Sequence, residues 1–345
     1  MTDQSQQSGI PLPFQLSRMV TSYWVPQSIH AAAELGIADA LAGGPRNSAE
    51  IARAVDAHPD ALRRLMRALV ALDLCRMTDD GAFALTPLGE CLRSDSRDSV
   101  RAWVLLVVGT QCWTSWGRLV ECVRTGRSVP ALDDRDTWVE PNDDPAASAV
   151  FNQSMVQLTR HLAPAIAVSY DFGALRRIVD VGGGYGALLP PILKANPGLR
   201  GMVFDLPRCR DGARALAQKT GLADRYEFVA GDFFTDPLPN ADAYIIKSVI
   251  HDWDDERSVA ILERIRAAMS KDAVLLIVEP IVPERPGSSP FDGLLASTDL
   301  NMLVVTGGRE RTEADFRALV ERAGLRVTRV TQMPAMMSII EGRLP

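Results

Sequence analysis

The chain contains little cysteine, and its cysteines do not form a recognisable motif. Among 345 residues there are five, and no two of them form a C-x-x-C pair. An odd number in a chain of this length argues against a disulfide framework. We therefore expect reduced thiols in a cytoplasmic protein, because reducing compartments keep thiols free.

Long apolar runs and a secretory leader are also missing. The longest apolar runs, such as Trp103–Val108 and Ala273–Val278, are far shorter than the roughly 20 residues that cross a bilayer. The first residues, MTDQSQQSGIPLPF, have no basic stretch followed by an apolar one, as a secretory signal would. The sequence therefore predicts no membrane partner.

Positive charge is not in excess either. The formal net charge is −6, which argues against general nucleic-acid binding because such proteins carry a basic surface. The composition, with 47% apolar and 23% charged residues, is typical of a packed globular protein. At roughly 100–200 residues per domain, the length suggests two domains or one large one.

The N-terminal part has the pattern of short helices followed by a hairpin. One apolar helical face contains Leu62, Leu65, Met66, Leu69 and Val70. Upstream, Ser48 is a plausible N-cap for a helix over Ala49–Val55. Downstream, Leu74–Met77 and Ala82–Thr86 predict two short strands around a turn. This order predicts a winged helix within a mainly helical domain over residues 1–168.

From residue 169 onward, strands alternate with helices. The expected strands are Ile178–Val181, Met202–Phe204, Tyr226–Val229, Ala243–Ile246 and Val274–Val278. The stretches of helical length between them include Leu188–Asn196, Cys209–Thr220 and Asp255–Ser270. This alternation predicts an α/β, Rossmann-like domain over residues 169–345 with a mostly parallel sheet. An antiparallel C-terminal pair is expected from Val327–Thr331 and Ser338–Glu341.

Site residues stand at the carboxyl ends of five successive expected strands, where open parallel sheets bind ligands. In chain order they are Asp180 with the glycines that follow it, Asp205, Asp232, His251 and Glu279. The glycines let a ligand approach the backbone closely, and Asp205 suits the two hydroxyls of a ribose. Five such positions are a stronger signal than any single motif.

The glycine loop alone leaves the cofactor open. Residues 182–187 also satisfy the G-x-G-x-x-A pattern of nicotinamide sites, so a dehydrogenase is one alternative. Asp180, however, would repel a pyrophosphate and attract the ammonium of an amino-acid cofactor. Asp232 can accept a hydrogen bond from a purine amine, and Phe233 can cover the ring. Together these residues favour S-adenosylmethionine.

Five motifs resemble those of one enzyme family. They are Asp180–Gly186 (DVGGGYG), Val203–Pro207 (VFDLP), Gly231–Phe234 (GDFF), Ile245–Glu256 (IIKSVIHDWDDE) and Gly307–Thr312 (GGRERT). As a set they resemble the plant-type small-molecule O-methyltransferases, which include caffeic acid methyltransferases and bacterial enzymes that tailor aromatic natural products. The resemblance covers nearly the whole chain. It implies an S-adenosylmethionine-dependent O-methyltransferase of antibiotic or other secondary metabolism that acts on a small hydroxylated aromatic molecule.

The resemblance also implies residue roles. His251 is the expected catalytic base, flanked by Glu279 and Glu310. The resemblance implies cofactor contacts from Gly182, Asp205, Asp232, Phe233 and Lys247. The neighbouring residues Asp180, Gly184, Leu206, Gly231 and Ser248 are expected to join them at the cofactor. Substrate contacts are expected from Met155, Asp252, Trp253, Asn301 and Met302. Ser248 departs from plant members, which often have tryptophan there, so contacts near the adenine or the substrate are expected to differ.

The resemblance further implies a homodimer through the N-terminal domain, in which Met19–Trp24 could reach a partner's pocket. No metal is expected. Four acids after the motif histidine could suggest Mg²⁺, but Asp254 or Asp255 is expected to cap the following helix instead.

The expected base must remove a proton from a weak acid. A phenol has a pKa of about 10 and histidine one of about 6.5, so full transfer would cost roughly 5 kcal/mol. A nearby sulfonium lowers the phenol's pKa, and a glutamate can stabilise the charged imidazole. Two further alternatives stay open. One is hydroxylation, decarboxylation or cyclisation on the same fold, and the other is a DNA-binding regulator that uses Arg63, Arg64 and Arg67.

Overall fold

The computed structural model describes residues 10–135, 137, 144–287, 290–334 and 336–345. Contacts between α-carbons divide the chain into two units, Met1–Thr110 and Gln111–Pro345. The predicted boundary between residues 168 and 169 coincides instead with the end of a long helix, α12 (Pro145–Ser169). As a functional boundary it stays a prediction.

The first unit consists of short helices and one small hairpin. Its elements are α1 (Leu12–Thr21), α2 (Trp24–Glu34), α3 (Ile37–Ala40), α4 (Ser48–Ala54), α5 (Pro59–Ala71), β1 (Cys75–Met77), β2 (Phe83–Leu85), α6 (Pro87–Glu90) and α7 (Arg101–Val107). Helices α4 and α5 and the antiparallel pair β1–β2 follow the predicted order. The finer description as a winged helix stays a prediction.

The predicted apolar face of α5 lies in the core of this unit. Leu62, Met66 and Leu69 are buried and belong to one cluster with Ile51 of α4 and Phe83 of β2. Burial of a continuous stripe at this spacing is what holds an amphipathic helix in place.

The predicted cap of α4 is wrong by one residue. Asn47 caps the helix, because its side chain accepts from the Glu50 amide at 3.0 Å while the Glu50 carboxylate accepts from the Asn47 amide at 2.9 Å. Ser48 could not close such a reciprocal capping box, since the residue three positions after it is Ile51.

The second unit is built around a seven-stranded sheet. Its strands are β3 (Arg177–Val181), β4 (Arg200–Asp205), β5 (Tyr226–Ala230), β6 (Ala243–Lys247), β7 (Val274–Pro280), β8 (Arg326–Gln332) and β9 (Met337–Arg343). Their spatial order is β5-β4-β3-β6-β7-β9-β8, and every neighbouring pair is parallel except the two that β9 makes. The predicted mostly parallel sheet with an antiparallel C-terminal strand is confirmed.

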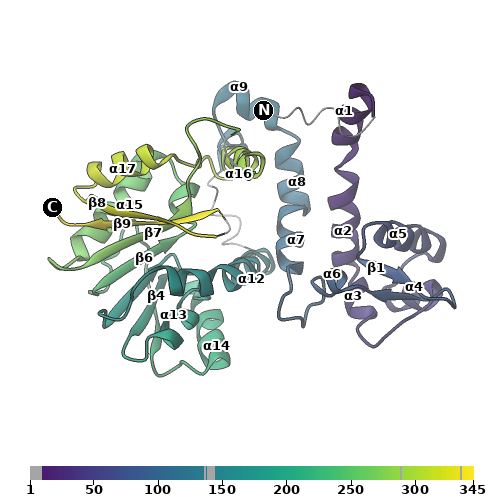
Figure 1. Cartoon of the computed structure of the whole chain (residues 1–345), viewed down its shortest axis with the longest axis horizontal. Coiled ribbons are helices and arrows are strands. Elements are labelled where there is room, and N and C mark those ends of the chain that lie inside the picture. The colour runs from purple at the N-terminus through teal and green to yellow at the C-terminus, as the bar shows by residue number, and fades with distance from the viewer. Residues whose placement is uncertain (1–9, 136, 138–143, 288–289, 335) are drawn as a thin grey trace. The chain divides into compact units, whose positions relative to one another are not determined.

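The helices of the second unit cover both faces of the sheet. The α-helices of this unit are α8 (Thr110–Trp116), whose first residue ends the first unit, α9 (Leu119–Thr125), α10 (Val129–Leu132), α12, α13 (Leu189–Ala195), α14 (Arg210–Thr220), α15 (Asp255–Ala268), α16 (Asp292–Val305) and α17 (Glu313–Arg322), as far as the structure describes the chain. Of these, α9, α10 and α16 pack on one another in a cluster of their own. Helices α13 and α14 pack on one face and α15 and α17 on the other (Figure 1). In the described part of the chain, no helix combines the length and apolar character of a membrane span.

The strand order of the sheet predicts a ligand site at the carboxyl ends of its central strands. Strands β4 and β5 lie on one side of β3, whereas β6 and β7 lie on the other. The order therefore reverses between β3 and β6, and open α/β sheets bind ligands at the carboxyl ends of such strands.

Candidate active site

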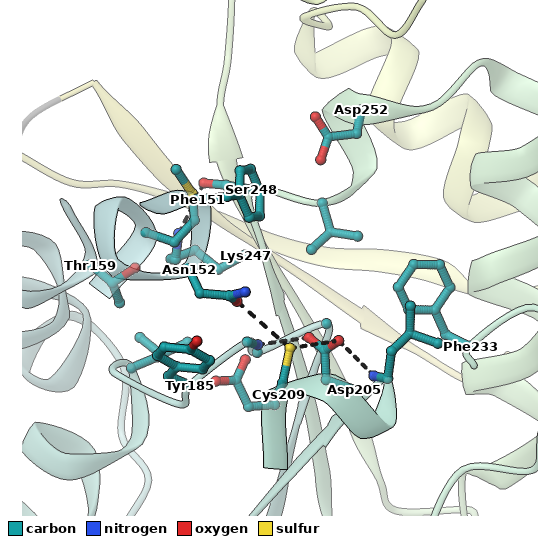
Figure 2. A pocket seen from close by; sticks show the side chains of 18 of the residues that line it. Phe151, Asn152, Thr159, Tyr185, Asp205, Cys209, Phe233, Lys247, Ser248 and Asp252 are labelled. Atoms are coloured by element: carbon teal, nitrogen blue, oxygen red, sulfur yellow. Dashed lines mark hydrogen bonds between the residues drawn. The ribbon is translucent and has the colours of Figure 1, made fainter. Parts of the chain in front are cut away.

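A cavity of about 310 Å³ lies at the carboxyl ends of β3, β4, β5 and β6. One wall is α12, which contributes Phe151, Asn152 and Thr159, and Figure 2 shows these side chains together with Asp205 and Lys247 from the strand ends. The cavity is therefore located where the sheet topology predicts a ligand.

The glycine loop shapes the cavity through its backbone. Gly182 and Gly184 have φ angles of +68° and +57°, a region that side chains disfavour. A Cβ on Gly182 would also approach the Val249 side chain to 3.0 Å. A residue with a side chain at Gly182 would thus be strained and would crowd the neighbouring loop.

Asp205, the last residue of β4, is fixed by two backbone amides. Its Oδ2 accepts from the Gly184 amide at 2.7 Å, and its Oδ1 accepts from the Leu206 amide at 2.6 Å (Figure 2). Burial raises the pKa of Asp205, and the two amides partly offset that shift because they stabilise the charged form. A carboxylate held in this way can present its edge to a diol.

Asp180 and Lys247 place opposite charges at the ends of the neighbouring strands β3 and β6. Burial raises the pKa of Asp180 to about 7, while the charge of Lys247 acts in the opposite direction. Oδ2 of Asp180 is buried and has no hydrogen-bond partner among the described residues. A buried acceptor of this kind calls for an outside donor, so the site fits a ligand that carries an ammonium group.

Ser248 stands directly after Lys247 in a strained conformation. Its φ of +51° lies in the left-handed region, which a non-glycine residue rarely adopts. Its hydroxyl accepts a hydrogen bond from Nζ of Lys247 at 3.1 Å. The residue that departs from the plant pattern thus orients the lysine at the cavity wall.

Aromatic side chains gather beside the end of β5. Phe234 contacts Phe233 and Trp253 edge to face, with ring centroids 4.9 Å apart in both pairs. Arg257 lies over Trp253, with its guanidinium carbon 5.2 Å from the ring centroid. All of these residues line the cavity beside Asp232, a combination of ring faces and carboxylate that suits a purine.

His251 lies on a short 3₁₀ turn, η3 (Ile250–Asp252), among three carboxylates. Its Nδ1 is 3.1 Å from Oε1 of Glu310 and 3.7 Å from Oε2 of Glu279, and its Nε2 is 3.9 Å from Oδ1 of Asp252. Glu279 also accepts from the Val249 and Ile250 amides at 2.9 and 3.0 Å. The glutamates therefore hold one side of the ring, and Asp252, which lines the cavity, faces the other.

The charges around His251 reverse the expected effect of burial. Burial alone lowers the pKa of this histidine, but the carboxylates of Glu279, Glu310 and Asp252 outweigh it and raise the pKa to about 10. Burial correspondingly raises the pKa of Asp252 to about 7, against the attraction of His251. The imidazole is thus a much stronger base than a free histidine.

The cavity includes most of the predicted site. All ten predicted cofactor residues line it, as do Met155, Asp252 and Trp253. His251, Glu279 and Glu310 form the cluster behind Asp252 and are not themselves among the lining residues.

Two predicted substrate residues lie elsewhere. Oδ1 of Asn301 accepts from Nε1 of Trp116 at 2.9 Å, and Met302 is buried. Neither residue lines the cavity. The resemblance indicated this helix, which is α16, and a substrate role for its two residues stays a prediction.

Sequence reasoning missed most of α12. Within it Asn152, Ser154, Gln157 and Thr159 are polar yet buried, and Asn152 and Thr159 line the cavity. Oδ1 of Asn152 accepts a weak bond from Sγ of Cys209 at 3.6 Å, and Cys209 makes the same contact with Asp205 (Figure 2). The available signal was the cluster of polar residues in the middle of α12, because those of them that are buried need partners.

One of the acidic residues that follow His251 caps the next helix. Asp254 caps α15, as its Oδ1 accepts from the Arg257 amide at 2.8 Å. A separate group of donor atoms, from His251, Glu279 and Glu310, lies within 4.8 Å of one another, close enough for a metal ion. The predicted absence of a metal stays a prediction.

Comparison with known proteins identifies the family. Residues 116–326 match the O-methyltransferase domain, and residues 17–95 match the O-methyltransferase dimerisation domain. The chain belongs to the O-methyltransferase family. It is an S-adenosylmethionine-dependent O-methyltransferase, and its dimerisation domain supports the predicted homodimer. The alternative of a nicotinamide dehydrogenase is thereby set aside, whereas the absence of nucleic-acid binding stays a prediction.

Relatives of this O-methyltransferase span nearly its full length. It is 36% identical to the phenazine O-methyltransferase PhzM of Lysobacter antibioticus, over 99% of both chains. It is 39% identical to the mitomycin biosynthesis 6-O-methyltransferase of Streptomyces lavendulae, over 89% of this chain and 87% of the relative. A solved structure of NcsB1 from neocarzinostatin biosynthesis, with S-adenosylmethionine and 2-hydroxy-5-methyl naphthoic acid, has 36% identity and a TM-score of 0.77. That match covers 93% of this chain and 96% of that one.

Proposed function

We propose that this O-methyltransferase methylates a phenolic hydroxyl of a small aromatic natural product, with His251 as the general base. The observation that carries the proposal is the position of His251. Its Nδ1 is anchored on Glu310 at 3.1 Å, and its Nε2 points toward Asp252 on the wall of the cofactor cavity. A base held on one nitrogen, whose other nitrogen is turned toward the cavity wall at Asp252, is the arrangement that can remove a proton from a hydroxyl bound there.

The raised pKa of His251 changes the energetics of proton transfer. A phenol and an imidazole that both titrate near 10 exchange a proton at almost no cost, instead of the roughly 5 kcal/mol expected for an ordinary histidine. The free-energy cost then falls on an earlier step, because either the phenol or the protonated imidazole must first lose a proton to solvent. At pH 7 the deprotonation of a group with a pKa of 10 costs roughly 4 kcal/mol, because the pH lies about 3 units below the pKa.

Each part of the cavity has a separate task. When bound, the cofactor would supply a methyl group carried on a sulfonium sulfur. Asp205 and the glycine loop would hold its sugar, Asp232 and the aromatic side chains would hold its purine, and Asp180 would bind its ammonium. His251 would accept the proton that the substrate hydroxyl loses. Alignment of these groups supplies much of the acceleration.

The lining of the cavity favours a flat apolar substrate. Met155, Val156 and Phe151 on α12 line it together with the aromatic cluster. Such walls accept an aromatic ring and leave its hydroxyl to the polar groups. The names of the relatives refer to a phenazine, a mitomycin and a naphthoic acid, which are also small natural products with ring systems. We further infer that the homodimer works in the cytoplasm without nucleic acid.

The proposal is tested by mass spectrometry of products. The purified enzyme is incubated with S-adenosylmethionine and a panel of hydroxylated phenazines, naphthoates and benzoates. A gain of one methyl group, resistant to acid but removed by an ether-cleaving reagent, is the expected result. Turnover of the panel without a methyl gain would instead favour hydroxylation, decarboxylation or cyclisation.

A further inference from the structure

The turn that carries His251 is gripped by a segment near the C-terminal end of the chain. The amide of Arg309 donates to the carbonyl of His251 at 2.9 Å, and the carboxylate of Glu310 accepts from the His251 ring at 3.1 Å. A Cβ on Gly308 would collide with that same carbonyl oxygen. Two successive residues therefore bind the backbone and the ring of one histidine.

Arg311 continues this contact with a fully buried guanidinium. It donates to the carbonyl of Ile250 at 3.0 Å and to the carbonyl of Trp253 at 2.9 Å. These carbonyls lie immediately before His251 and two residues after it. The guanidinium also pairs with Asp255 at 2.8 Å, where α15 begins.

The geometry of the bonds explains why an arginine stands here. Burying a positive charge is costly unless each donor finds a partner. An ion pair with Asp255 alone would satisfy the charge, yet two arms of the fork reach separate carbonyls on either side of His251. A lysine ammonium is a compact point donor and cannot span these positions together.

We propose that Arg311 is a positioning residue for His251, because it fixes the turn Ile250–Trp253 so that the ring stays between Glu310 and the cofactor cavity. The inference rests on the proposed role of His251 as the base. Arg311 touches neither the cavity nor the reacting atoms, so its effect passes through the turn alone.

Losing the hydrogen bonds from Arg311 to the turn and losing the positive charge of Arg311 should change the pKa of His251 in opposite directions. Removing a nearby cation would favour the charged imidazole and raise the pKa of His251. Releasing the turn would move the ring away from Glu279 and Glu310 and let the pKa fall toward its ordinary value near 6.5. The direction of the change therefore separates positioning from simple electrostatics.

The test compares Arg311→Lys with Arg322→Lys. Arg322 is a surface control, since it pairs with Glu256 at 2.6 Å and so also reaches α15, but does not contact the turn. Histidine resonances of the full-length enzyme with bound S-adenosylhomocysteine are followed by NMR across pH. The chain has four histidines, and His251→Gln assigns the relevant signal.

We expect Arg311→Lys to lower the titration midpoint of His251 by about one unit or more. Its kcat should fall while its Kd for S-adenosylmethionine is kept, and Arg322→Lys should change neither. An unchanged or higher midpoint in Arg311→Lys overturns the proposal. If His251→Ala keeps full turnover while the NMR shift is present, the positioning role stands and the role of His251 as base does not.

A second variant serves if Arg311→Lys does not fold. The double variant Arg311→Met/Asp255→Met removes the buried cation with its counter-charge, a replacement that proteins often tolerate. The same lowered midpoint is expected, and an unchanged midpoint contradicts the proposal. Asp255→Asn alone leaves both carbonyl bonds in place and should titrate like the wild type.

Discussion

The cofactor end of the site is the cavity itself, and the proposed catalytic end lies behind Asp252. The two ends are built in different ways. The cofactor end consists of strand termini whose backbone amides hold side chains such as Asp205. The catalytic end combines His251, Glu279 and Glu310, which come from three separate segments and are largely buried. Binding thus depends on a backbone surface of fixed shape, whereas proton transfer depends on a balance of charges shielded from water.

The largest effect should come from His251→Ala. Turnover is expected to fall by about 10²–10⁴, the usual contribution of a positioned base. Affinity for S-adenosylmethionine should stay unchanged, because His251 is not among the residues that line the cavity. Steady-state kinetics and calorimetric titration measure the two quantities. An equal loss of both would mean that the two ends are not independent.

Asp205→Ala should have the converse effect. Loss of a carboxylate that accepts from a ribose is expected to weaken cofactor binding by about 10–100-fold, since hydrogen bonds to charged groups contribute about 1.5–3 kcal/mol. The value of kcat at saturating cofactor should change little. Asp224→Ala, an exposed position before β5, is the control. A selective drop in kcat would contradict the division of the cavity.

The pH profile probes the charge balance at the catalytic end. Because the folded pKa of His251 is raised to about 10, kcat/KM should rise with pH from neutrality toward that value. Glu279→Gln and Glu310→Gln each remove a charge that raises the pKa, so the acid limb should move to lower pH. Glu313→Gln, which affects only a surface pair with Arg317, should leave the profile in place. If the wild type and all three variants gave identical profiles, the acid limb would not report the titration of His251.

The same group makes folding depend on pH. Its folded pKa of about 10 lies above the unfolded value of 6.5, so the stability it contributes is complete below pH 6.5. That stability is lost as the pH rises through about 10. Thermal unfolding of the wild type should therefore shift more over this range than that of His251→Gln, as measured by calorimetry. Parallel Tm curves would argue against the charged imidazole.

The smallest effect should come from Trp116→Phe. It removes the hydrogen bond to Asn301 between α8 and α16, at a cost of about 0.5–1.5 kcal/mol in unfolding free energy. Neither residue lines the cavity, so kcat and both affinities should stay close to wild type. A large loss of substrate affinity would instead support the predicted substrate contact of Asn301.

The cofactor end could be predicted from sequence because its residues lie next to strands. Each strand shows a run of apolar residues, and the polar residue that ends the run marks the sheet edge. Asp180, Asp205 and Asp232 were located in this way. The antiparallel C-terminal pair was also predictable, since both of its strands have the expected spacing.

The catalytic end could be predicted only in part. The strand ends supplied His251 and Glu279, and the resemblance supplied Glu310. Asp252 was expected only as a substrate contact, and no pattern in the chain indicated that it would join this cluster or that the charges would raise the pKa of the histidine. Such shifts arise from distances across the fold and from burial. The inward face of α12 was missed for the same reason, because helical periodicity does not say which neighbour a polar side chain will meet.

Helix α1 has a consequence for the behaviour of the protein in dilute solution. It has 10 residues, none of them buried against the described part of the chain, and Phe14 and Met19 are largely exposed. A free helix shorter than about 12–15 residues is marginal in water. We expect its order to come from contacts with the second copy of the homodimer that the dimerisation domain supports. By mass action, dilution below the dimer dissociation constant should melt this end first and leave the cofactor cavity intact.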